Sequence, residues 1–291
     1  MLCGLIAFLM VFLKPGIFNN EKKSAELVDK ETDEGQKIEK IRLEILEKCI
    51  NVIIKDKNNK NKNALYLYNS NAKRNIILVH GYRGMPEIDF AEEFKFLQKS
   101  DFNILLIRLG TLYPNSGNFI TMGLKEKEEL VPWVEFFKKE NSLPIYIWSQ
   151  SMGTYSTLSC LDVLQDKVSG VIADCGYTSV YSDFMDTVNR VVHFPPLSFL
   201  IVAATGFWVS LIIHKSIFSH STVEKVKDNN IPTLFVHGDS DTLVDKKHTL
   251  KNYENNKGKK DLLLVKNANH LASFNVSQEE YIQKLKTFFG W

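Results

Sequence analysis

Short apolar runs alternate with helix-compatible segments through most of the chain. The apolar runs are uniformly hydrophobic, where a strand with one face in water would alternate with polar residues. Such runs are typical of a parallel sheet that helices cover on both faces. They lie at residues 75–79, 103–109, 145–148, 170–174 and 233–236, and helices are expected at 89–99, 126–140 and 154–164 between them.

Further elements precede and follow this alternation. Residues 51–54 and 64–68 predict a hairpin around a loop rich in Lys and Asn, and residues 261–265 predict a last strand. Ser277-Gln278-Glu279-Glu280 has the form of a capping box, which predicts a final helix ending near Phe289.

The alternation stops between Cys175 and Pro232. Residues 179–192 predict a helix, Pro195-Pro196 breaks it, and residues 197–213 are apolar, uncharged and rich in Phe and Trp. This apolar stretch predicts either a helical lid over a substrate pocket or a membrane span, since a span needs about 20 residues. We favour the lid, because a span would separate two halves of one sheet. An apolar lid could still touch a membrane surface.

The first residues of the chain form a second apolar segment. Residues 1–13 are almost continuously apolar and end at Lys14-Pro15-Gly16. They predict an N-terminal anchor, a truncated signal segment or a helix packed on the domain, and membrane association is favoured. Residues 21–50 are charged and predict a helical approach segment outside the catalytic core. The chain thus divides into residues 1–50, a first core part at 51–176, a helical lid insertion at 177–230 and a second core part at 231–291.

Composition excludes several classes of function. The net charge of +2 is spread over the chain, which does not predict a nucleic-acid-binding face. The four cysteines are widely separated, so a disulfide scaffold is not expected. No pattern typical of a metal site or of a dinucleotide fingerprint follows a predicted strand, and we expect neither a metal nor another cofactor.

One turn carries a candidate nucleophile. The run from Ile145 to Gly153 is an apolar strand that ends in small-x-Ser-x-Gly, with Ser151 between Ser149 and Gly153. A nucleophile elbow has this form, because a sharp strand-to-helix turn exposes the serine hydroxyl and leaves room only for small neighbours. Taking Ser149 as the nucleophile would place the β-branched Ile147 at a crowded position, so Ser151 is favoured.

The other groups that an activated serine needs follow later strands. Asp241, with Asp239 as the alternative, lies just after residues 233–236 and can orient a base. His270 lies beyond the last predicted strand and is the candidate base. The oxyanion donors are expected to be the backbone N–H groups of Met152, directly after the nucleophile, and of Tyr82, in the turn after the first buried strand. His80, in that same turn, is expected to be structural.

Together these residues resemble the α/β-hydrolase superfamily, and most of all its bacterial branch near the serine aminopeptidases and prolyl oligopeptidase-like hydrolases. The resemblance spans about residues 64–290 and rests on residues 79–84, Thr121-Met122-Gly123 with Glu126, residues 149–153, residues 174–179, residues 237–241 and Asn269-His270. It implies an α/β-hydrolase fold with a mostly parallel sheet, helices on both faces and a lid. The sequence departs from the family at Ser149, where Gly is usual, and at the loop from Gly110 to Asn118, where relatives carry an Arg-Gly-His-Gly-type turn.

These observations predict a serine hydrolase that acts on an ester, or less readily on a thioester or small amide, with an apolar or acyl group. Two alternatives remain open: an exopeptidase on short peptides, and an inactive hydrolase-fold protein that binds a ligand or a membrane. Contact with a membrane surface would use residues 1–13 or the lid. The sequence leaves the compartment open between membrane-associated and cytoplasmic.

Overall fold

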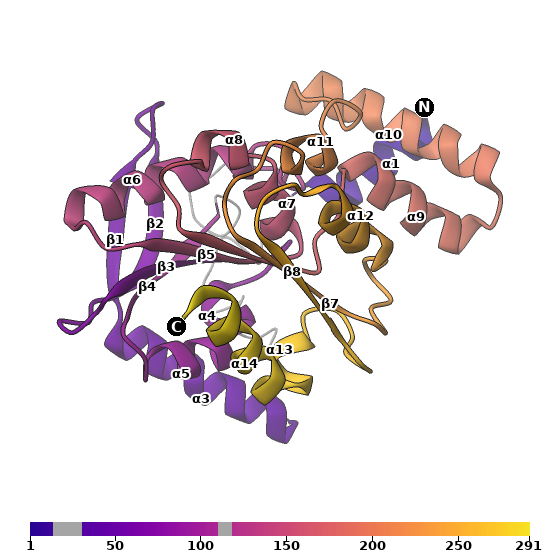
Figure 1. Ribbon diagram of the computed structural model, residues 1–291. Helices are drawn as coiled ribbons and strands as arrows, with labels where there is room; N and C mark the ends of the chain where they lie inside the picture. Colours follow the sequence, from indigo (N-terminus) through magenta and orange to yellow (C-terminus); the bar gives the residue numbers. More distant parts are fainter. Residues whose placement is uncertain (14–30, 110–117) are drawn as a thin grey trace.

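An eight-stranded sheet crosses the middle of the protein, in the order β1-β2-β4-β3-β5-β6-β7-β8 (Figure 1). A computed structural model describes residues 1–13, 31–109 and 118–291. The strands are β1 (Ile50–Lys55), β2 (Asn61–Leu67), β3 (Arg74–Val79), β4 (Phe102–Arg108), β5 (Ile145–Gln150), β6 (Gly170–Asp174), β7 (Thr233–Gly238) and β8 (Lys260–Val265).

The sheet has the predicted, mostly parallel character. β1 pairs with β2 and β2 with β4 in antiparallel fashion, and every later pairing is parallel. All residues of β4, β5, β6 and β7 are buried, as expected for strands covered on both faces. The predicted hairpin is present as β1 and β2.

Helices cover both faces of the sheet (Figure 1). On one face lie α6 (Leu130–Glu140), which follows the 3-10 turn η2 (Glu126–Glu129), and α7 (Met152–Leu158), α8 (Leu161–Leu164) and α12 (Lys247–Asn255). On the other face lie α3 (Asp33–Lys48), α4 (Pro86–Asp89), α5 (Ala91–Leu97), α13 (Ser273–Val276) and α14 (Gln278–Phe289).

Two of these helices bear on the expectations for the ends of the chain. The helix predicted within residues 21–50 is present as α3, whose Ile41 and Ile45 are buried in the hydrophobic cluster of the sheet's second face. Residues 21–30 of that segment lie outside the described residues. The helix α14 begins as predicted, but the Ser277 hydroxyl oxygen accepts no backbone N–H of the first turn, so the capping box is not formed. The hydroxyl instead donates to the Glu280 carboxylate.

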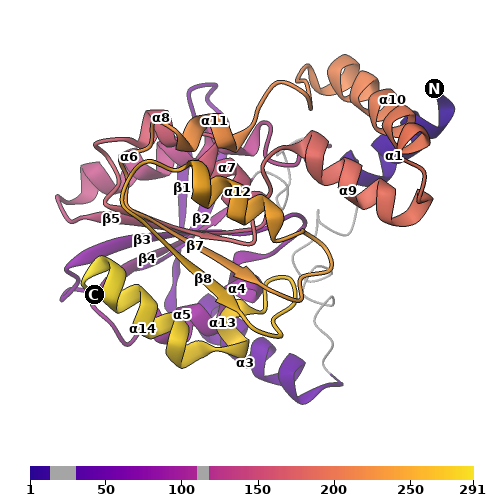
Figure 2. The ribbon, with the colours of Figure 1, turned by 45° about the vertical axis from the view of Figure 1, so that its right-hand side comes forward.

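The segment between β6 and β7 is a helical insertion. It contains α9 (Val180–Val192), α10 (Pro195–Ile213) and α11 (Thr222–Val226), and α10 begins with both prolines in its first turn, where their missing N–H groups cost nothing. Figure 2 shows α9 and α10 extending away from the sheet while α11 returns to it. By length and composition α10 could cross a membrane, although 33% of its most apolar stretch is buried inside the protein.

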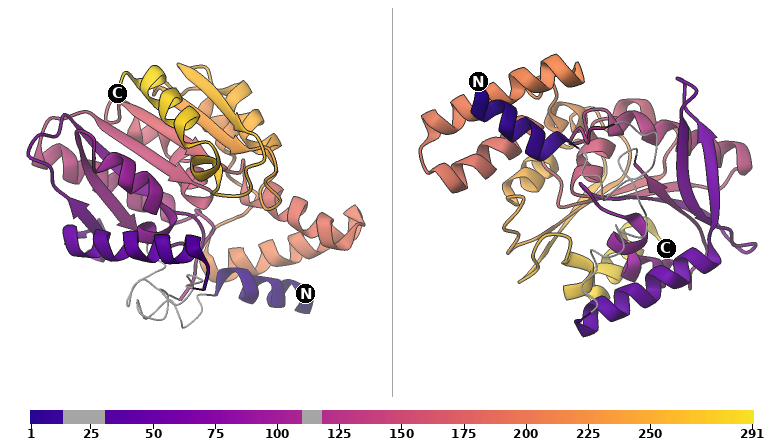
Figure 3. Two further views of the ribbon diagram at one scale, coloured as in Figure 1. Left: turned by 90° about the horizontal axis from the view of Figure 1, so that it is seen from below. Right: turned by 180° about the vertical axis from the view of Figure 1, so that it is seen from behind.

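The apolar N-terminal segment forms α1 (Leu2–Phe12), which packs on α10 and α9 (Figure 3). Phe8 and Phe12 are fully buried there, and the Phe12 ring meets Phe184 of α9 edge-on at 5.8 Å. Of the three predictions for residues 1–13, the packed helix is therefore present. Lys14-Pro15-Gly16 lies outside the described residues.

Candidate active site

The turn after β5 has the backbone of a nucleophile elbow. Ser151 has φ 52° and ψ −119°, a conformation that non-glycine residues rarely adopt and that persists only where surrounding contacts enforce it. The Ser151 N–H donates to the Asp174 carbonyl of β6 at 3.0 Å, and the Thr154 hydroxyl donates to the same carbonyl at 2.7 Å. These two bonds anchor both arms of the turn to the next strand.

The two small residues around Ser151 are small for different reasons. A Cβ on Gly153 would lie 2.2 Å from the Val79 carbonyl oxygen, so β3 excludes every side chain there. The sequence argument instead placed the crowding between positions 149 and 153. Ser149 fits because its hydroxyl donates to the Ile172 carbonyl at 3.0 Å. Ser149 is fully buried in that bond, which leaves Ser151 as the serine of the turn that faces the histidine.

The structure brings Ser151, His270 and Asp241 together from three separate loops. His270 Nε2 lies 2.9 Å from Ser151 Oγ, and His270 Nδ1 lies 2.7 Å from Asp241 Oδ2. Because an ionised carboxylate can only accept, Nδ1 carries the proton and Nε2 is left as an acceptor facing the serine. Asp239, the alternative acid, is exposed and accepts the Asn267 N–H at 2.7 Å.

Asp241 is held in one orientation by its second oxygen. Oδ1 accepts the N–H groups of Leu243 at 2.8 Å and Val244 at 2.9 Å. Burial alone would raise the pKa of Asp241, but hydrogen bonds from His237, His270 and the Val244 N–H hold its pKa well below the usual range. The carboxylate is therefore ionised and fixed, as a group that orients a histidine must be.

His237 is a neighbour of this group to which the sequence analysis gave no role. It ends β7, is fully buried, and its Nε2 lies 3.0 Å from the Val244 carbonyl and 3.3 Å from Asp241 Oδ2. A carbonyl only accepts, so Nε2 donates and Nδ1 accepts the Thr249 hydroxyl at 2.7 Å. His237 thus ties down the loop that carries Asp241. In the sequence, this contact is indicated by the position of His237, four residues before Asp241.

The two predicted oxyanion donors lie beside Ser151. Met152 is the first residue of α7, and the turn at Gly81 comes close enough that a Cβ on Gly81 would lie 3.3 Å from the Ser151 Cβ. Within the described ranges, neither the Met152 N–H nor the Tyr82 N–H donates a hydrogen bond to another residue. Both remain available to an oxygen bound at Ser151.

His80 supports the Gly81–Tyr82 turn through a hydrogen bond to the Gly81 carbonyl. It is fully buried, accepts the Leu109 N–H at Nε2 at 3.1 Å, and so donates from Nδ1 to the Gly81 carbonyl at 2.8 Å. Burial lowers the pKa of His80 to about 4. A neutral, doubly bonded imidazole agrees with the structural role expected from the sequence.

The same turn binds the N-terminal helix, which the sequence analysis did not predict. The Tyr82 hydroxyl donates to the Val11 carbonyl at 2.6 Å, and the Arg83 guanidinium donates to the Met10 carbonyl at 2.9 Å. These carbonyls belong to the last turn of α1, where intrahelical partners are missing. No local sequence signal marks this contact, because it joins residues about 70 positions apart.

Cys175 completes a set of possible metal-ligand atoms with Asp241 and His270, which lie within 4.8 Å of one another. The set does not suit a metal ion. His270 and Asp241 already bond to each other, and burial raises the pKa of the Cys175 thiol well above its ordinary value, so the sulfur is protonated. The three residues are better described as two members of the candidate triad, Asp241 and His270, with a buried, protonated thiol beside them.

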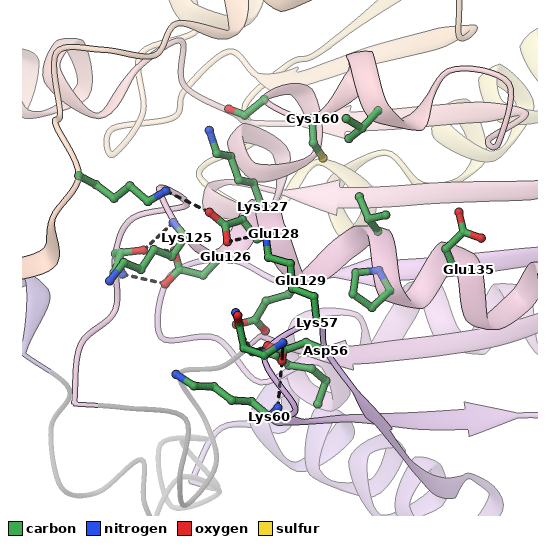
Figure 4. A pocket seen from close by; sticks show the side chains of 18 of the residues that line it. Asp56, Lys57, Lys60, Lys125, Glu126, Lys127, Glu128, Glu129, Glu135 and Cys160 are labelled. Carbon is green, nitrogen blue, oxygen red and sulfur yellow. Dashed lines mark hydrogen bonds and ion pairs between the residues drawn. The ribbon is translucent and has the colours of Figure 1, made fainter.

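A separate cavity of 920 Å³ lies between the β1–β2 hairpin, η2, α6 and α8 (Figure 4). It is lined mostly by charged side chains, several of them paired, such as Lys62 with Glu129 at 2.8 Å and Lys215 with Glu128 at 3.0 Å. None of the three triad residues lines it. The loop that the sequence analysis placed at the pocket border, residues 110–117, lies outside the described residues.

Comparisons with known proteins agree with the fold. No protein-family model matches the chain. The uncharacterised protein YqkD of Bacillus subtilis is 21% identical, over 98% of this chain and 93% of its own length.

Solved structures are similar over most of the chain. An esterase of Pyrococcus furiosus has a TM-score of 0.66 and 20% identity, covering 83% of this chain and 90% of that one. The α/β hydrolase GrgF of a Penicillium species has a TM-score of 0.63 and 14% identity, covering 84% and 99%. Est1E of Butyrivibrio proteoclasticus has a TM-score of 0.60 and 16% identity, covering 82% and 96%. The chain therefore has the α/β-hydrolase fold, while identities this low leave its chemistry to be argued from its own residues.

Proposed function

We propose that this α/β-hydrolase-fold chain is a serine hydrolase that cleaves an ester through an acyl-enzyme on Ser151. One observation carries the proposal: a continuous hydrogen-bonded path runs from Ser151 Oγ through His270 to Asp241, with the acceptor nitrogen of the imidazole facing the hydroxyl. A nucleophile, a base and an orienting acid in this relation are the minimum set for acyl transfer.

The chemistry follows from these positions. Ser151 Oγ attacks the acyl carbon while His270 Nε2 takes the hydroxyl proton, and Asp241 stabilises the imidazolium. The N–H groups of Met152 and Tyr82 hold the negative oxygen of the tetrahedral intermediate. Its collapse breaks the ester bond, and the leaving alcohol receives the proton from His270. Water, deprotonated by the same nitrogen, then releases the acid and restores the Ser151 hydroxyl.

An ester with an apolar or acyl group is the substrate class that the surroundings favour. The insertion between β6 and β7 contains α10, whose large side chains are mainly Leu, Ile, Phe and Val, and the esterase of Pyrococcus furiosus shares the fold. A thioester or small amide would use the same groups. A range of p-nitrophenyl esters of increasing acyl length should be hydrolysed, and the preferred length measures the acyl pocket.

An exopeptidase is the second candidate, and Asp183 is the residue that bears on it. An exopeptidase needs an ionised acid near the nucleophile to hold the peptide amine, and Asp183 lies in the first turn of α9. Burial raises the pKa of Asp183 to about 7, which makes it a weak partner for an ammonium group. Release of p-nitroaniline from aminoacyl p-nitroanilides faster than p-nitrophenol from simple esters would favour the peptidase.

A fluorophosphonate probe tests the nucleophile directly. The wild type and Ser149→Ala should both be labelled, and Ser151→Ala should not, because only Ser151 faces His270. Equal labelling of Ser151→Ala and wild type would reject the assignment. A wild type that neither reacts with the probe nor turns over any short ester would instead support the inactive, ligand-binding alternative.

A further inference from the structure

The outer faces of α1 and α10 form a continuous apolar surface, which we call the α1–α10 face. The exposed apolar residues are Leu2, Ile6, Leu9, Met10 and Leu13 on α1 and Leu197, Phe199, Leu200, Phe207 and Leu211 on α10. Those of α1 are mostly three or four residues apart, and Leu197, Leu200, Phe207 and Leu211 are three, seven and four residues apart, so most of each set lies along one side of its helix. Figure 3 shows the two helices side by side at the margin of the molecule, away from the sheet.

The helix α10 is apolar on its exposed side as well as on its buried side. It buries Val202, Val209 and Ile213 together with the small or polar residues Ser198, Thr205 and Gly206, while large apolar side chains such as Leu200 and Phe207 are exposed. The two hydroxyls donate to carbonyls of their own helix, from Ser198 to Phe194 and from Thr205 to Ile201. A water-facing helix buries its apolar stripe. Small residues between helices and large apolar ones outside are typical of helices in lipid.

The contact between the two helices has the same character. A Cβ on Gly4 would lie 2.5 Å from the Ala204 Cβ, so the backbones approach closely at a pair of small residues. The Trp208 indole donates to the Met1 carbonyl at 3.1 Å. The pair is thus held by close backbone contact and one indole hydrogen bond, which leaves the large side chains free for an outer partner.

The charges around this face suit an anionic surface. Residues 1–13 carry no charged side chain, and residues 187–223 contain no acidic residue, although they contain Arg190 and Lys215. Arg190 lies near the end of α9 at the edge of the face and is exposed, whereas Lys215, just after α10, is paired with Glu128 at 3.0 Å. Basic residues at the border of an apolar face favour anionic lipid headgroups.

The geometry fits docking in the interface better than a span. At 1.5 Å per residue α10 is about 28 Å long, but α1 is only about 16 Å long, roughly half the hydrocarbon thickness. α10 also packs on α9, which carries Asp186 in an ion pair with Lys247 at 2.6 Å. Both ends of the insertion return to the same sheet.

We propose that the α1–α10 face docks on the surface of an anionic lipid bilayer, with both helices lying in the plane of the interface. This goes beyond the proposed hydrolase activity and does not depend on it. Binding can therefore be measured whether or not an ester is cleaved.

Sedimentation with vesicles tests the proposal on the full chain. The probes are vesicles of mixed phosphatidylcholine and phosphatidylglycerol, and vesicles of phosphatidylcholine alone. The wild type should bind the mixed vesicles more tightly. The triple variant Leu200→Ser, Phe207→Ser, Leu211→Ser should lower the partition coefficient by about 100-fold or more, since each exposed side chain loses apolar burial.

A matched control uses apolar side chains that are equally exposed at the far edge of the sheet. The control is the triple variant Ile50→Ser, Ile53→Ser, Tyr68→Ser. Its three side chains lie on and beside the β1–β2 hairpin and are 61%, 55% and 66% exposed. It should bind as the wild type does. Equal loss in both variants, or no binding by the wild type, would overturn the proposal, and thermal unfolding of each variant confirms that it is folded.

Brominated lipids locate the contact independently. Trp208 fluorescence should be quenched in mixed vesicles and the quenching lost in Trp208→Phe, because Trp133 and Trp148 are buried in the core and Trp291 packs on Phe102 and Phe289 at the C-terminus. Resistance to extraction with alkaline carbonate would indicate a span and overturn surface docking. A dimer that the α10 variant dissociates, without vesicle binding by the wild type, would assign the face to a second copy of the chain.

Discussion

Replacing Asp241 by Asn tests the direction of every hydrogen bond in the candidate triad. The two carboxylate oxygens are not equivalent. Oδ1 accepts two fixed backbone N–H groups, at 2.8 and 2.9 Å, whereas Oδ2 faces His270, whose tautomer can change, and His237 Nε2 at 3.3 Å, which keeps the Val244 carbonyl as its acceptor. An amide NH2 at the Oδ1 position would direct its own N–H donors at the two backbone N–H donors of Leu243 and Val244. The Asn side chain must therefore place its oxygen there and turn its NH2 toward His270.

That orientation of the Asn side chain reverses the tautomer of the His270 imidazole. Facing an NH2, His270 Nδ1 must accept, so its proton moves to Nε2, which then donates to Ser151 instead of accepting its proton. The base is lost although every heavy atom keeps its place. A triad with the wrong tautomer loses about 10⁴ in kcat, or about 5 kcal/mol of transition-state stabilisation, in other hydrolases. We expect a similar loss in kcat for a short p-nitrophenyl ester, with KM changed little.

The control is Asp239→Asn, two residues away in the same loop. Asp239 is exposed and can keep its bond to the Asn267 N–H through the amide oxygen, so kcat should stay within about twofold of the wild type. If Asp241→Asn keeps kcat within tenfold of the wild type while unfolding at the same temperature, Asp241 does not orient His270 and the assignment of the acid is wrong.

Three further outcomes follow from the same contacts. His237→Phe keeps an aromatic ring but removes the donor to the Val244 carbonyl. The loss of about one hydrogen bond should lower kcat roughly five- to tenfold and shift the acidic limb of the pH–rate profile. Unchanged kinetics would show that His237 acts only as a core residue. Gly153→Ala places a Cβ against β3 and should reduce the free energy of unfolding by about 1–3 kcal/mol in urea titrations, with no reduction contradicting the close approach. Burial raises the pKa of Asp174 from 3.8 to about 6, so its proton stabilises the folded state below pH 4 and that contribution, about 3 kcal/mol, is lost as the pH rises through 6. The unfolding free energy of Asp174→Asn should not show that part of the fall, and parallel pH curves for variant and wild type would refute the raised pKa.

The sheet could be predicted from sequence because burial on both faces leaves a direct mark. A strand such as β4, with no exposed residue, must be apolar along its whole length, and its neighbours in the chain must be helices. The helix α12 carries no such mark. It is mostly polar, and its buried residues are His248, Thr249 and Asn252, so no apolar stripe marks it in the sequence and it was not predicted.

In the candidate site, too, some residues could be identified from the sequence pattern and others could not. Ser151, Asp241 and His270 could be selected because each follows a predicted strand, and strand ends of a parallel sheet meet at one edge. Contacts between distant loops could not be selected. The bond from His237 to the Val244 carbonyl and the bonds from the Gly81–Tyr82 turn to α1 depend on three-dimensional packing. The reason for Gly153 was also mislocated, since the crowding comes from β3 and not from the elbow itself.

The contact between α1 and the oxyanion turn links the two proposals. A helix end needs partners for its last carbonyls, and a loop beside a nucleophile needs supports that keep its N–H groups aimed at the reacting oxygen. Tyr82 and Arg83 bear on both needs, because their side chains donate to the last carbonyls of α1 while the adjoining Gly81 approaches Ser151 closely. If α1 lies on a bilayer, the turn that would hold the oxyanion is fastened to the membrane-facing helix. An ester dissolved in that bilayer would then reach Ser151 from the side of the protein on which α1 and the Gly81–Tyr82 turn lie.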